Sequence, residues 1–483
     1  MVKLIGLDLG TTGVRFECFD TDGKILASGR SEIDKETVAK WLSALRIAVP
    51  KRFRSRNPGD AVLSAQGTSG TTILADEYGN DIFRPLMYYE KNPEQFRKIE
   101  KRPSIRDLAK KGVSISVTSP LPKLLGVREK YPDTFRKVRW ILPATTWLLY
   151  RLAFPEGQRW EELTTDWTNA LKFGADITSE NPSWFTPLFN DVGIPIELLP
   201  RVVACGEELG HAQSSLAQQL GLGGARIFQG MTDGNATALA IGCMKDGDFG
   251  FNSGSSTVVK YACNRMKPHR ALYYHKHPFS GYLAGAAPVT LSTAKWFAEK
   301  IMGISVERAF QLAKIEDLGE ECLYFPQGDR EPFSDPELGA SFLKVWPDNT
   351  SQGRARGKMF RSMILGLTFF EYSYITLLEK LFDSKVSKAN ITGGGTRSPW
   401  WNKLRASIYG IPVNVIEERS GIGALIPAAM KLKLFKNLAE AQGKLLQITD
   451  TFSPDRDLGA KYMSLRDNFL KRWEMIRETS SVS

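Results

Sequence analysis

The chain has 483 residues, of which 24% are charged and 11% aromatic, which is typical of a folded protein large enough for two domains. No apolar run is as long as a membrane span, and the N-terminal run meets Asp8 too early for a secretory signal, so we expect a cytoplasmic protein without a membrane partner. Acidic residues interrupt the basic runs behind the net charge of +11, which favours a solvated, anion-attracting surface over nucleic-acid binding.

The cysteines indicate a reduced interior. They are odd in number, and no two of them form a Cys-x-x-Cys pair. The five are Cys18, Cys205, Cys243, Cys263 and Cys322. This pattern favours buried free thiols over a disulfide framework or a zinc site.

The most informative segment lies near the N-terminus, where two predicted strands enclose a short turn. An apolar run at 4–7 leads to Asp8, and a second extended run covers 14–19. The turn residues are Gly10, Thr11, Thr12 and Gly13. Their backbone N–H groups and hydroxyls suit phosphate oxygens, and Asp8 suits a divalent cation that bridges phosphates. The alternative is an ordinary hairpin turn.

Mixed α/β structure is predicted for the rest of the first half. Strands and helices are expected at 60–65, 71–75, 122–129 and 143–152. Residues 160–200 are rich in turns and aromatic side chains, which is more typical of a lid or a substrate wall than of a core layer.

A carboxylate follows the last predicted strand of this half. The strand covers 222–230 and leads through Thr232 to Asp233 and Gly234, where a helix of small residues at 235–244 begins. A carboxylate at a strand end and a helix N-terminus is a candidate general base for a hydroxyl. The alternative is a helix cap. We expect a hinge at 245–248.

The strand, turn and strand of the N-terminus recur half a chain later. Apolar runs at 249–252 and 258–261 enclose a second turn of small residues. This turn contains Gly254, Ser255, Ser256 and Thr257. The repeat predicts two domains of like fold, each with a hairpin that faces phosphate, and the alternative is coincidence.

A run of glycines marks the second half. A predicted strand at 390–392 leads to Gly393, Gly394, Gly395 and Thr396, and helices are expected at 292–300, 353–381, 399–409, 421–432 and 455–479. Glycine lets a backbone approach a flat base closely, so the run is a candidate contact for adenine or ribose. The alternative is a flexible strand-to-helix turn.

Taken in order, the Asp8 turn, Thr232-Asp233-Gly234, the Gly254 turn and the triple glycine resemble the FGGY carbohydrate kinases of the actin-like ATPase superfamily. The resemblance spans nearly the whole chain. It implies an α/β protein with two ribonuclease-H-like domains facing across a central cleft. The expected parts are an N-terminal domain with substrate-side insertions at 1–245, a nucleotide-binding domain at 246–445 and a helical segment at 446–483.

The resemblance also implies an activity: ATP-dependent phosphorylation of a small sugar. It assigns Asp233 as the general base, Asp8 and Asp233 as holding Mg²⁺, and both hairpin turns to the phosphates of ATP. The triple glycine and Asn402 would border the nucleotide. A nucleotide-gated actin-like binding or regulatory protein without kinase activity is the alternative.

Segments at 66–72 and 166–172 resemble ribulokinase- and xylulokinase-like pentulose kinases, so D-ribulose or D-xylulose is the expected substrate. The candidate sugar-binding residues are Thr68, Ser69, Asp166, Trp167, Asn169 and Asp233. A capped turn with a packing tryptophan is the alternative for 166–169. The stretch Gln66-Gly67-Thr68 departs from the Gln-Met-His-Gly of many pentulose kinases, which leaves another ketose or a polyol open. A homodimer is an open option for the assembly.

Overall fold

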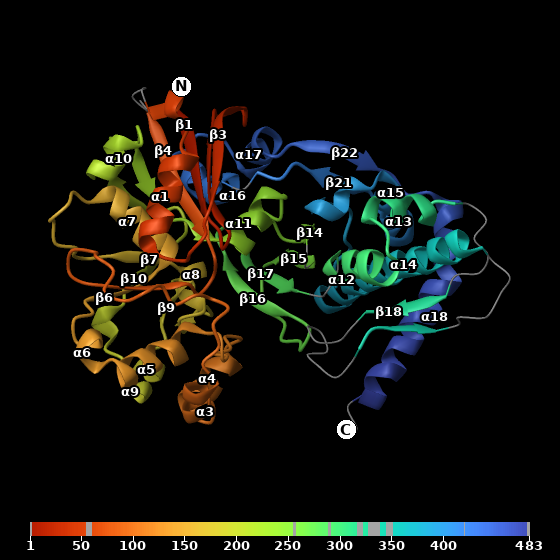
Figure 1. Cartoon of the computed structure of the whole chain (residues 1–483), viewed down its shortest axis with the longest axis horizontal. Coiled ribbons are helices and arrows are strands. Elements are labelled where there is room, and N and C mark those ends of the chain that lie inside the picture. The colour runs from red at the N-terminus through yellow and green to blue at the C-terminus, as the bar shows by residue number, and fades with distance from the viewer. Residues whose placement is uncertain are drawn as a thin grey trace. The chain divides into compact units, whose positions relative to one another are not determined.

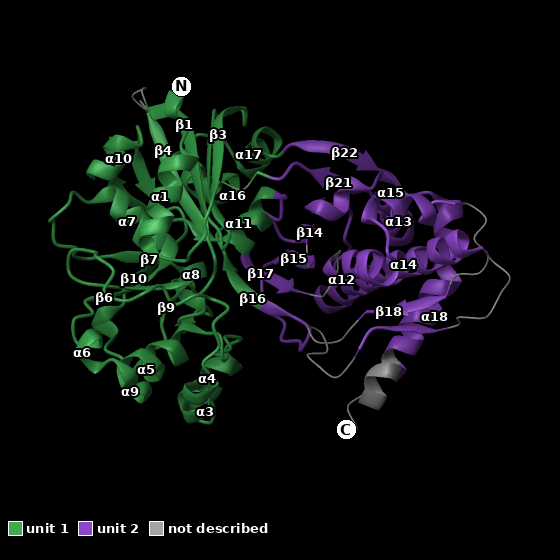
Figure 2. Cartoon of the chain, in the orientation of Figure 1, with its two compact units in different colours: residues 1–240, 274–279, 419–446 green, residues 241–273, 280–418, 447–483 purple. Residues whose placement is uncertain are grey.

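The computed structural model describes residues 2–54, 60–254, 257–287, 291–315, 322–326, 339–343, 351–419 and 421–480 (Figure 1). The chain divides into two compact units, coloured green and purple in Figure 2. Unit 1 comprises Met1–Ala240, Tyr274–Phe279 and Arg419–Leu446, and unit 2 comprises Ile241–Tyr273, Ser280–Glu418 and Gln447–Ser483. Within the described residues, no helix is both long and apolar enough to cross a membrane.

Unit 1 is a mixed α/β unit. Its strands are β1 (Lys3–Leu9), β2 (Gly13–Phe19), β3 (Ile25–Glu32), β4 (Ala61–Gly67), β5 (Thr72–Ala75), β6 (Trp140–Pro143), β7 (Thr164–Asp166), β8 (Ala175–Asp176), β9 (Ser183–Trp184), β10 (Arg201–Val203), β11 (Glu208–His211), β12 (Arg226–Phe228), β13 (Met231–Thr232) and most of β16 (Tyr273–His277). Its helices are α1 (Val38–Ala48), α2 (Lys51–Arg54), α3 (Pro93–Ile99), α4 (Pro103–Lys110), α5 (Pro120–Lys130), α6 (Pro132–Phe135), α7 (Ala144–Ala153), α8 (Trp167–Leu171), α9 (Thr186–Val192), η1 (Ile196–Leu198), α10 (Ser215–Gln219), α11 (Asp233–Ala240), α16 (Ile422–Lys431) and α17 (Leu438–Leu445).

Unit 2 has the same mixture. Its strands are β14 (Phe249–Ser253), β15 (Thr257–Cys263), β17 (Gly281–Ala286), β18 (Leu323–Phe325), β19 (Ser341–Leu343), β20 (Ala389–Thr392), β21 (Val413–Ile416) and β22 (Ile448–Phe452). Its helices are α12 (Leu291–Trp296), η2 (Phe297–Ile301), α13 (Val306–Ala313), α14 (Gln352–Phe382), η3 (Gly394–Arg397), α15 (Pro399–Tyr409) and α18 (Arg456–Ser480).

The central sheet of unit 1 is built around the N-terminal hairpin. Its strands run in the order β3-β2-β1-β4-β12-β11, and β13 also pairs with β4. β1 is antiparallel to β2 and parallel to β4. Every β1 residue from Leu4 to Leu9 is buried, and Trp41 and Leu45 of α1 belong to the same core cluster. The apolar run at 4–7 thus forms a central strand, as predicted.

Unit 2 repeats this arrangement. The corresponding strands run in the order β17-β15-β14-β20-β21-β22. Here too the hairpin pair is antiparallel, β14 is parallel to β20, and the last strand is antiparallel to its neighbour. The six strands therefore match those of unit 1 in order and direction, and the predicted internal repeat is confirmed.

The prediction of one continuous strand at 222–230 is wrong. Gly221 and Gly224 have positive φ angles of 68° and 81°, so a turn precedes the strand. The chain then forms two short strands, β12 and β13, which pair with β4 at different positions. The break falls at Gly230, where a Cβ would lie 1.6 Å from the carbonyl oxygen of Ala65. Only glycine allows this approach to β4.

Candidate active site

Three parallel strand ends bring the predicted catalytic residues of unit 1 together. On β4, Gln66 is opposite Asp8 of β1 on one side and opposite Met231 of β13 on the other. Asp233 follows β13 directly and begins α11. Because the carboxyl ends of parallel strands share one edge of a sheet, Asp8, Gln66 and Asp233 lie at the same edge, which is where α/β sheets bind ligands.

Asp8 is a buried carboxyl group whose ionised form is disfavoured by its surroundings. It is 9% exposed, and burial raises its pKa to about 7. The Arg15 guanidinium, 3.8 Å away, and a hydrogen bond from Gln66 oppose this rise, whereas the Asp233 carboxylate adds to it. Two carboxylates that repel each other favour a bound cation or a proton between them.

The donor set fits Mg²⁺. No group of three or more His, Cys, Asp or Glu side chains suited to a metal occurs within the described residues. Mg²⁺ differs from structural metals because it binds through one or two carboxylates and completes its shell with phosphate oxygens and water. Asp8 and Asp233 are two carboxylates at one sheet edge, so the residues present fit the ion.

The first turn forms a hairpin with an accessible tip. The Gly10 N–H donates to the carbonyl oxygen of Gly13 at 3.0 Å, and Thr12 is exposed. The hydroxyl of Thr11 donates to the Tyr88 hydroxyl at 3.4 Å. At Gly13 a Cβ would lie 2.5 Å from the carbonyl oxygen of Ser31, so this glycine is needed for the pairing of β2 with β3.

Asp233 is held by a short polar network. Its Oδ1 accepts from the Gly234 N–H at 2.7 Å. In the same turn, Asn235 Nδ2 donates to the Thr232 hydroxyl at 2.6 Å and lies 3.0 Å from Nδ1 of the buried His275. These contacts fix the strand-to-helix turn that presents the carboxylate.

The segment at 166–169 forms the capped turn that was one of its two predicted interpretations. Asp166 is the N-cap of α8 and accepts hydrogen bonds from the backbone N–H groups and side chains of Thr168 and Asn169. The Thr168 hydroxyl also accepts from the Thr232 N–H at 2.9 Å. This bond attaches α8 to the strand that precedes Asp233.

Unpaired polar atoms gather around these elements. Four buried side-chain atoms have no hydrogen-bond partner within the described chain: Gln66 Oε1, Ser69 Oγ, Trp167 Nε1 and Asn169 Oδ1. Thr68, by contrast, is paired with the Thr71 hydroxyl at 2.6 Å. Buried polar groups without partners are costly, so a cluster of donors and acceptors indicates a place for water or a polyhydroxy ligand.

Lys172 was not singled out from the sequence. It is the residue after α8, and its side chain runs past Gly70, where a Cβ would lie 3.4 Å from its Cδ. Desolvation by the surrounding protein atoms lowers the pKa of Lys172, and the Asp233 carboxylate raises it. Its position in the chain, one residue beyond a short helix, gave no signal, because only the fold brings it near Asp233.

In unit 2 the structure brings the second hairpin and the triple glycine together. Gly393 has a φ of 93°, and a Cβ there would lie 2.4 Å from Oδ1 of Asn252. Asn402 Nδ2 donates to the carbonyl oxygen of Thr396 at 2.7 Å. Asn252 Oδ1 and the Thr257 hydroxyl are buried without a partner among the described residues. Ser255 and Ser256 lie outside those residues.

The glycines of these two turns differ in how closely other atoms surround them. Gly394 has open space where a Cβ would stand, whereas Gly395 is buried and accepts a hydrogen bond from Arg405 at 3.2 Å. Gly254 is partly exposed at the end of β14. The sequence did not single out Arg405 or its partner Glu371.

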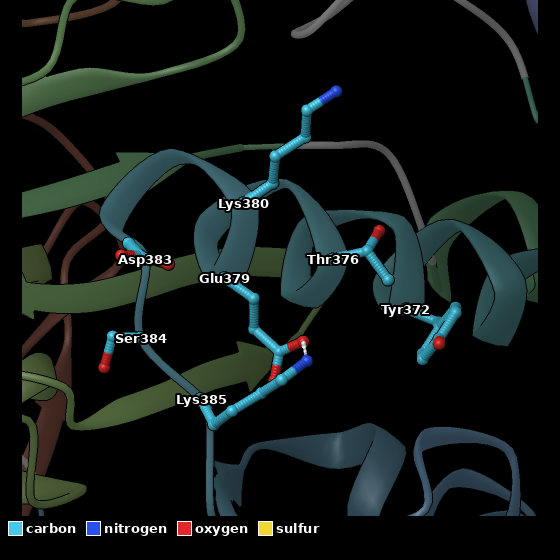
Figure 3. A pocket seen from close by; sticks show the side chains of 7 residues that line it. All are labelled: Tyr372, Thr376, Glu379, Lys380, Asp383, Ser384 and Lys385. Carbon is cyan, nitrogen blue, oxygen red and sulfur yellow. Dashed lines mark hydrogen bonds and ion pairs between the residues drawn. The ribbon is translucent and has the colours of Figure 1, made fainter.

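A separate pocket of about 500 Å³ lies at the C-terminal end of α14. Its lining residues are Tyr372, Thr376, Glu379, Lys380, Asp383, Ser384 and Lys385. Figure 3 shows the Glu379 and Lys385 side chains meeting in an ion pair of 2.9 Å, while Lys380 points away. None of the residues predicted for catalysis or binding lines this pocket.

Family models and known proteins agree with this architecture. Residues 63–240 match the N-terminal domain model of the FGGY family of carbohydrate kinases, and residues 280–432 match its C-terminal domain model. A protein named xylulose kinase from Staphylococcus epidermidis is 24% identical, over 99% of this chain and 98% of its own length. An autoinducer-2 kinase from Yersinia enterocolitica is 21% identical, over 96% of this chain and 93% of its own.

Solved structures show the same fold. A gluconate kinase from Lactobacillus acidophilus superposes with a TM-score of 0.84 at 18% identity and covers 99% of each chain. The two family models and the full-length relatives together establish the family that the sequence resembles. The chain belongs to the FGGY family of carbohydrate kinases and is an ATP-dependent sugar kinase.

Proposed function

We propose that the chain phosphorylates a hydroxyl of a ketopentose, with D-ribulose or D-xylulose as the substrate. The observation that supports this most is the edge of the unit 1 sheet. Two carboxylates lie there, beside buried polar atoms without partners from Gln66, Ser69 and α8. A small molecule with several hydroxyls and a carbonyl would satisfy such a mixed set of donors and acceptors.

Asp233 is the proposed general base. A sugar hydroxyl is a weak nucleophile, and a carboxylate within hydrogen-bond reach accepts its proton as the bond to phosphorus forms. The Asn235 contacts orient the turn, and the N-terminus of α11 favours the ionised carboxylate. Lys172 adds a positive group that interacts with the Asp233 carboxylate, and this interaction raises the pKa of Lys172.

Asp8 and Asp233 would hold Mg²⁺, which neutralises phosphate charge during transfer when it is bound. The accessible tip at Thr12 is proposed to contact phosphate oxygens through its hydroxyl and backbone. In unit 2 the residues proposed for the nucleotide are Gly254, Ser255, Ser256, Thr257, Gly393, Gly394, Gly395, Thr396 and Asn402. The Thr257 hydroxyl and Asn252 Oδ1, which have no partner among the described residues, support a polar ligand there.

The substrate is tested by ADP release with ATP and magnesium across a panel of sugars. D-ribulose and D-xylulose are compared with gluconate and autoinducer-2, because two similar proteins are named gluconate kinase and autoinducer-2 kinase. We expect the highest kcat/KM with a ketopentose. A preference of tenfold or more for gluconate, autoinducer-2 or a polyol would contradict the proposed substrate.

Replacement of the base gives the first prediction. Asp233→Asn keeps the shape of the side chain but cannot accept the hydroxyl proton, so we expect kcat to fall by about 10²- to 10⁴-fold. The Kd for ADP, measured by calorimetry, should change by less than threefold. Turnover within tenfold of wild type would show that another group removes the proton.

A further inference from the structure

Arg405 lies at the centre of a buried network in unit 2. Its guanidinium donates through Nε and Nη2 to the two carboxylate oxygens of Glu371, at 2.9 and 2.8 Å. Nη2 also donates to the Ser253 hydroxyl at 2.9 Å. Nη1 donates to the carbonyl oxygen of Gly395 at 3.2 Å and to Asn402 Oδ1 at 3.4 Å. An arginine has five N–H donors, and each of them has a partner here.

The network is closed to solvent. The side chains of Arg405 and Glu371 are 0% and 2% exposed. Tyr409 donates to Glu371 Oε2 at 2.6 Å, and the guanidinium lies over the Trp401 ring, 3.7 Å from its centroid. A planar fork that pairs with a carboxylate and stacks on an aromatic ring has one orientation, which lysine could not reproduce.

The segments that Arg405 joins are far apart in the sequence. Ser253 ends β14, immediately before the turn at Gly254, and Gly395 lies in the triple-glycine turn. Asn402, a second partner of Arg405, holds the carbonyl oxygen of Thr396 in that same turn. One guanidinium therefore contacts the triple-glycine turn directly at Gly395 and the last strand residue before the hairpin turn at Ser253.

A buried ion pair is a poor device for stability alone. Removing two charges from water costs several kcal/mol, and apolar residues of the same volume often serve as well. What the pair supplies is a fixed arrangement of its hydrogen-bond partners. In this chain those partners include Ser253, at the end of β14, and Gly395, in the triple-glycine turn.

We propose that Arg405 is a positioning residue for nucleotide binding, which sets the hairpin turn after Ser253 and the triple-glycine turn in the arrangement that ATP requires. This inference rests on the proposed nucleotide role of the two loops. Arg405 on α15 and Glu371 on α14 would then determine ATP affinity from the interior, without touching the nucleotide.

The test uses the full chain and a pair of matched substitutions. Ser253→Ala removes the hydroxyl that links Arg405 to β14, and because Ser253 is 0% exposed, the variant removes no surface that a ligand could contact. Ser407→Ala is the control, since Ser407 is a buried serine on α15 whose hydroxyl binds the carbonyl oxygen of Lys403 and the Asp455 N–H, away from both loops. Arg405→Lys retains the charge without the fork.

Four quantities are measured for each variant: the Kd for ADP with magnesium, the KM for ATP, the KM for the sugar and the melting temperature. For Ser253→Ala we expect the ADP Kd and the ATP KM to rise by about 3- to 10-fold, with the sugar KM within twofold of wild type. Arg405→Lys should raise both nucleotide constants further. Ser407→Ala should leave them unchanged at a comparable loss of melting temperature.

Two outcomes separate this inference from the proposed function. If Ser253→Ala and Arg405→Lys lower only the melting temperature while the nucleotide constants stay at wild-type values, the network is structural and the inference is wrong. If the wild type transfers no phosphate to any sugar of the panel, yet the ADP Kd depends on Ser253 and Arg405 as expected, the proposed function fails and the inference stands.

Discussion

Lys123 shows how an interior charge responds to pH. The residue is 4% exposed and donates to the carbonyl oxygen of Met87 at 2.6 Å. Burial lowers its pKa from 10.5 to about 8, and the Glu90 carboxylate opposes the shift. The folded chain therefore releases a proton at a lower pH than the unfolded chain does. Between pH 8 and 10.5 the unfolded state binds more protons, so the contribution of Lys123 to stability rises with pH.

This gives a prediction for Lys123→Met. The free energy of unfolding of wild type, relative to the variant, should increase from pH 8 to pH 10 by at most about 1.4 kcal/mol per pH unit. Urea unfolding at several pH values measures it. The same substitution at the exposed Lys388 should give no such trend. A difference between wild type and Lys123→Met that falls with pH would contradict the assignment.

Single residues could be proposed for the site from the sequence where a local pattern surrounds them. Asp8 and Asp233 each follow an apolar run and precede a turn, and this local pattern was enough to propose them. Arg405 gave no such signal, since its partners Ser253 and Glu371 are 152 and 34 residues away in the chain. Lys172 was missed for the same reason. Contacts of this kind depend on the sheet order, which no short window contains.

Among the described helices, α11 and α16 cross with little room between their backbones. At Gly423 a Cβ would lie 1.9 Å from the carbonyl oxygen of Ala236, a backbone atom that cannot yield without moving α11. Since α11 begins at Asp233, any shift of this helix also moves the proposed base.

We therefore expect Gly423→Ala to destabilise the protein by about 1–3 kcal/mol. The substitution should lower kcat by a larger factor than the factor by which it changes the KM for the sugar. Gly443→Ala is the matched control. Gly443 lies inside α17 with open space around its missing Cβ, so alanine should stabilise that helix by about 0.5–1 kcal/mol and leave activity unchanged. Thermal unfolding and steady-state kinetics of both variants measure the contrast. Equal melting temperatures for the two would contradict the close approach.

Element predictions succeeded where periodicity and capping agreed. The helix expected at 399–409 is α15, with Ser398 as its N-cap and Gly410 in the left-handed region after its end. The helix expected at 292–300 is instead α12 followed by a π-helical turn, η2. Apolar spacing alone does not distinguish an α-helical from a π-helical continuation, because both keep the same face buried over one turn.

For the whole molecule, the recurrence of one hairpin predicted two like-folded halves, and the matching strand orders confirm it. The path of the chain was not predictable in this way. Arg419–Leu446 belongs to unit 1, where α16 contacts β1, β4 and α11. The small residues at 421–432 predicted a helix, but nothing local indicates which sheet this helix covers.

This return of the chain predicts that residues 1–245 do not fold alone. Without α16, the buried faces of β1 and α11 would be exposed to water, which an incomplete core cannot tolerate. We expect residues 1–245 to lack a cooperative urea transition, and the addition of 419–446 through a flexible linker to restore one. A monomeric 1–245 fragment with a sharp transition would show that α16 is dispensable for unit 1.

All five cysteines are buried and none of them forms a disulfide; two lie in unit 1 and three in unit 2. Burial raises the pKa of Cys18 to about 11 and that of Cys263 to about 12, so little of the reactive thiolate exists at neutral pH. Alkylating reagents can therefore reach these sulfur atoms only when the surrounding structure opens. The rate of labelling at each cysteine measures how often its own unit opens, without any added probe.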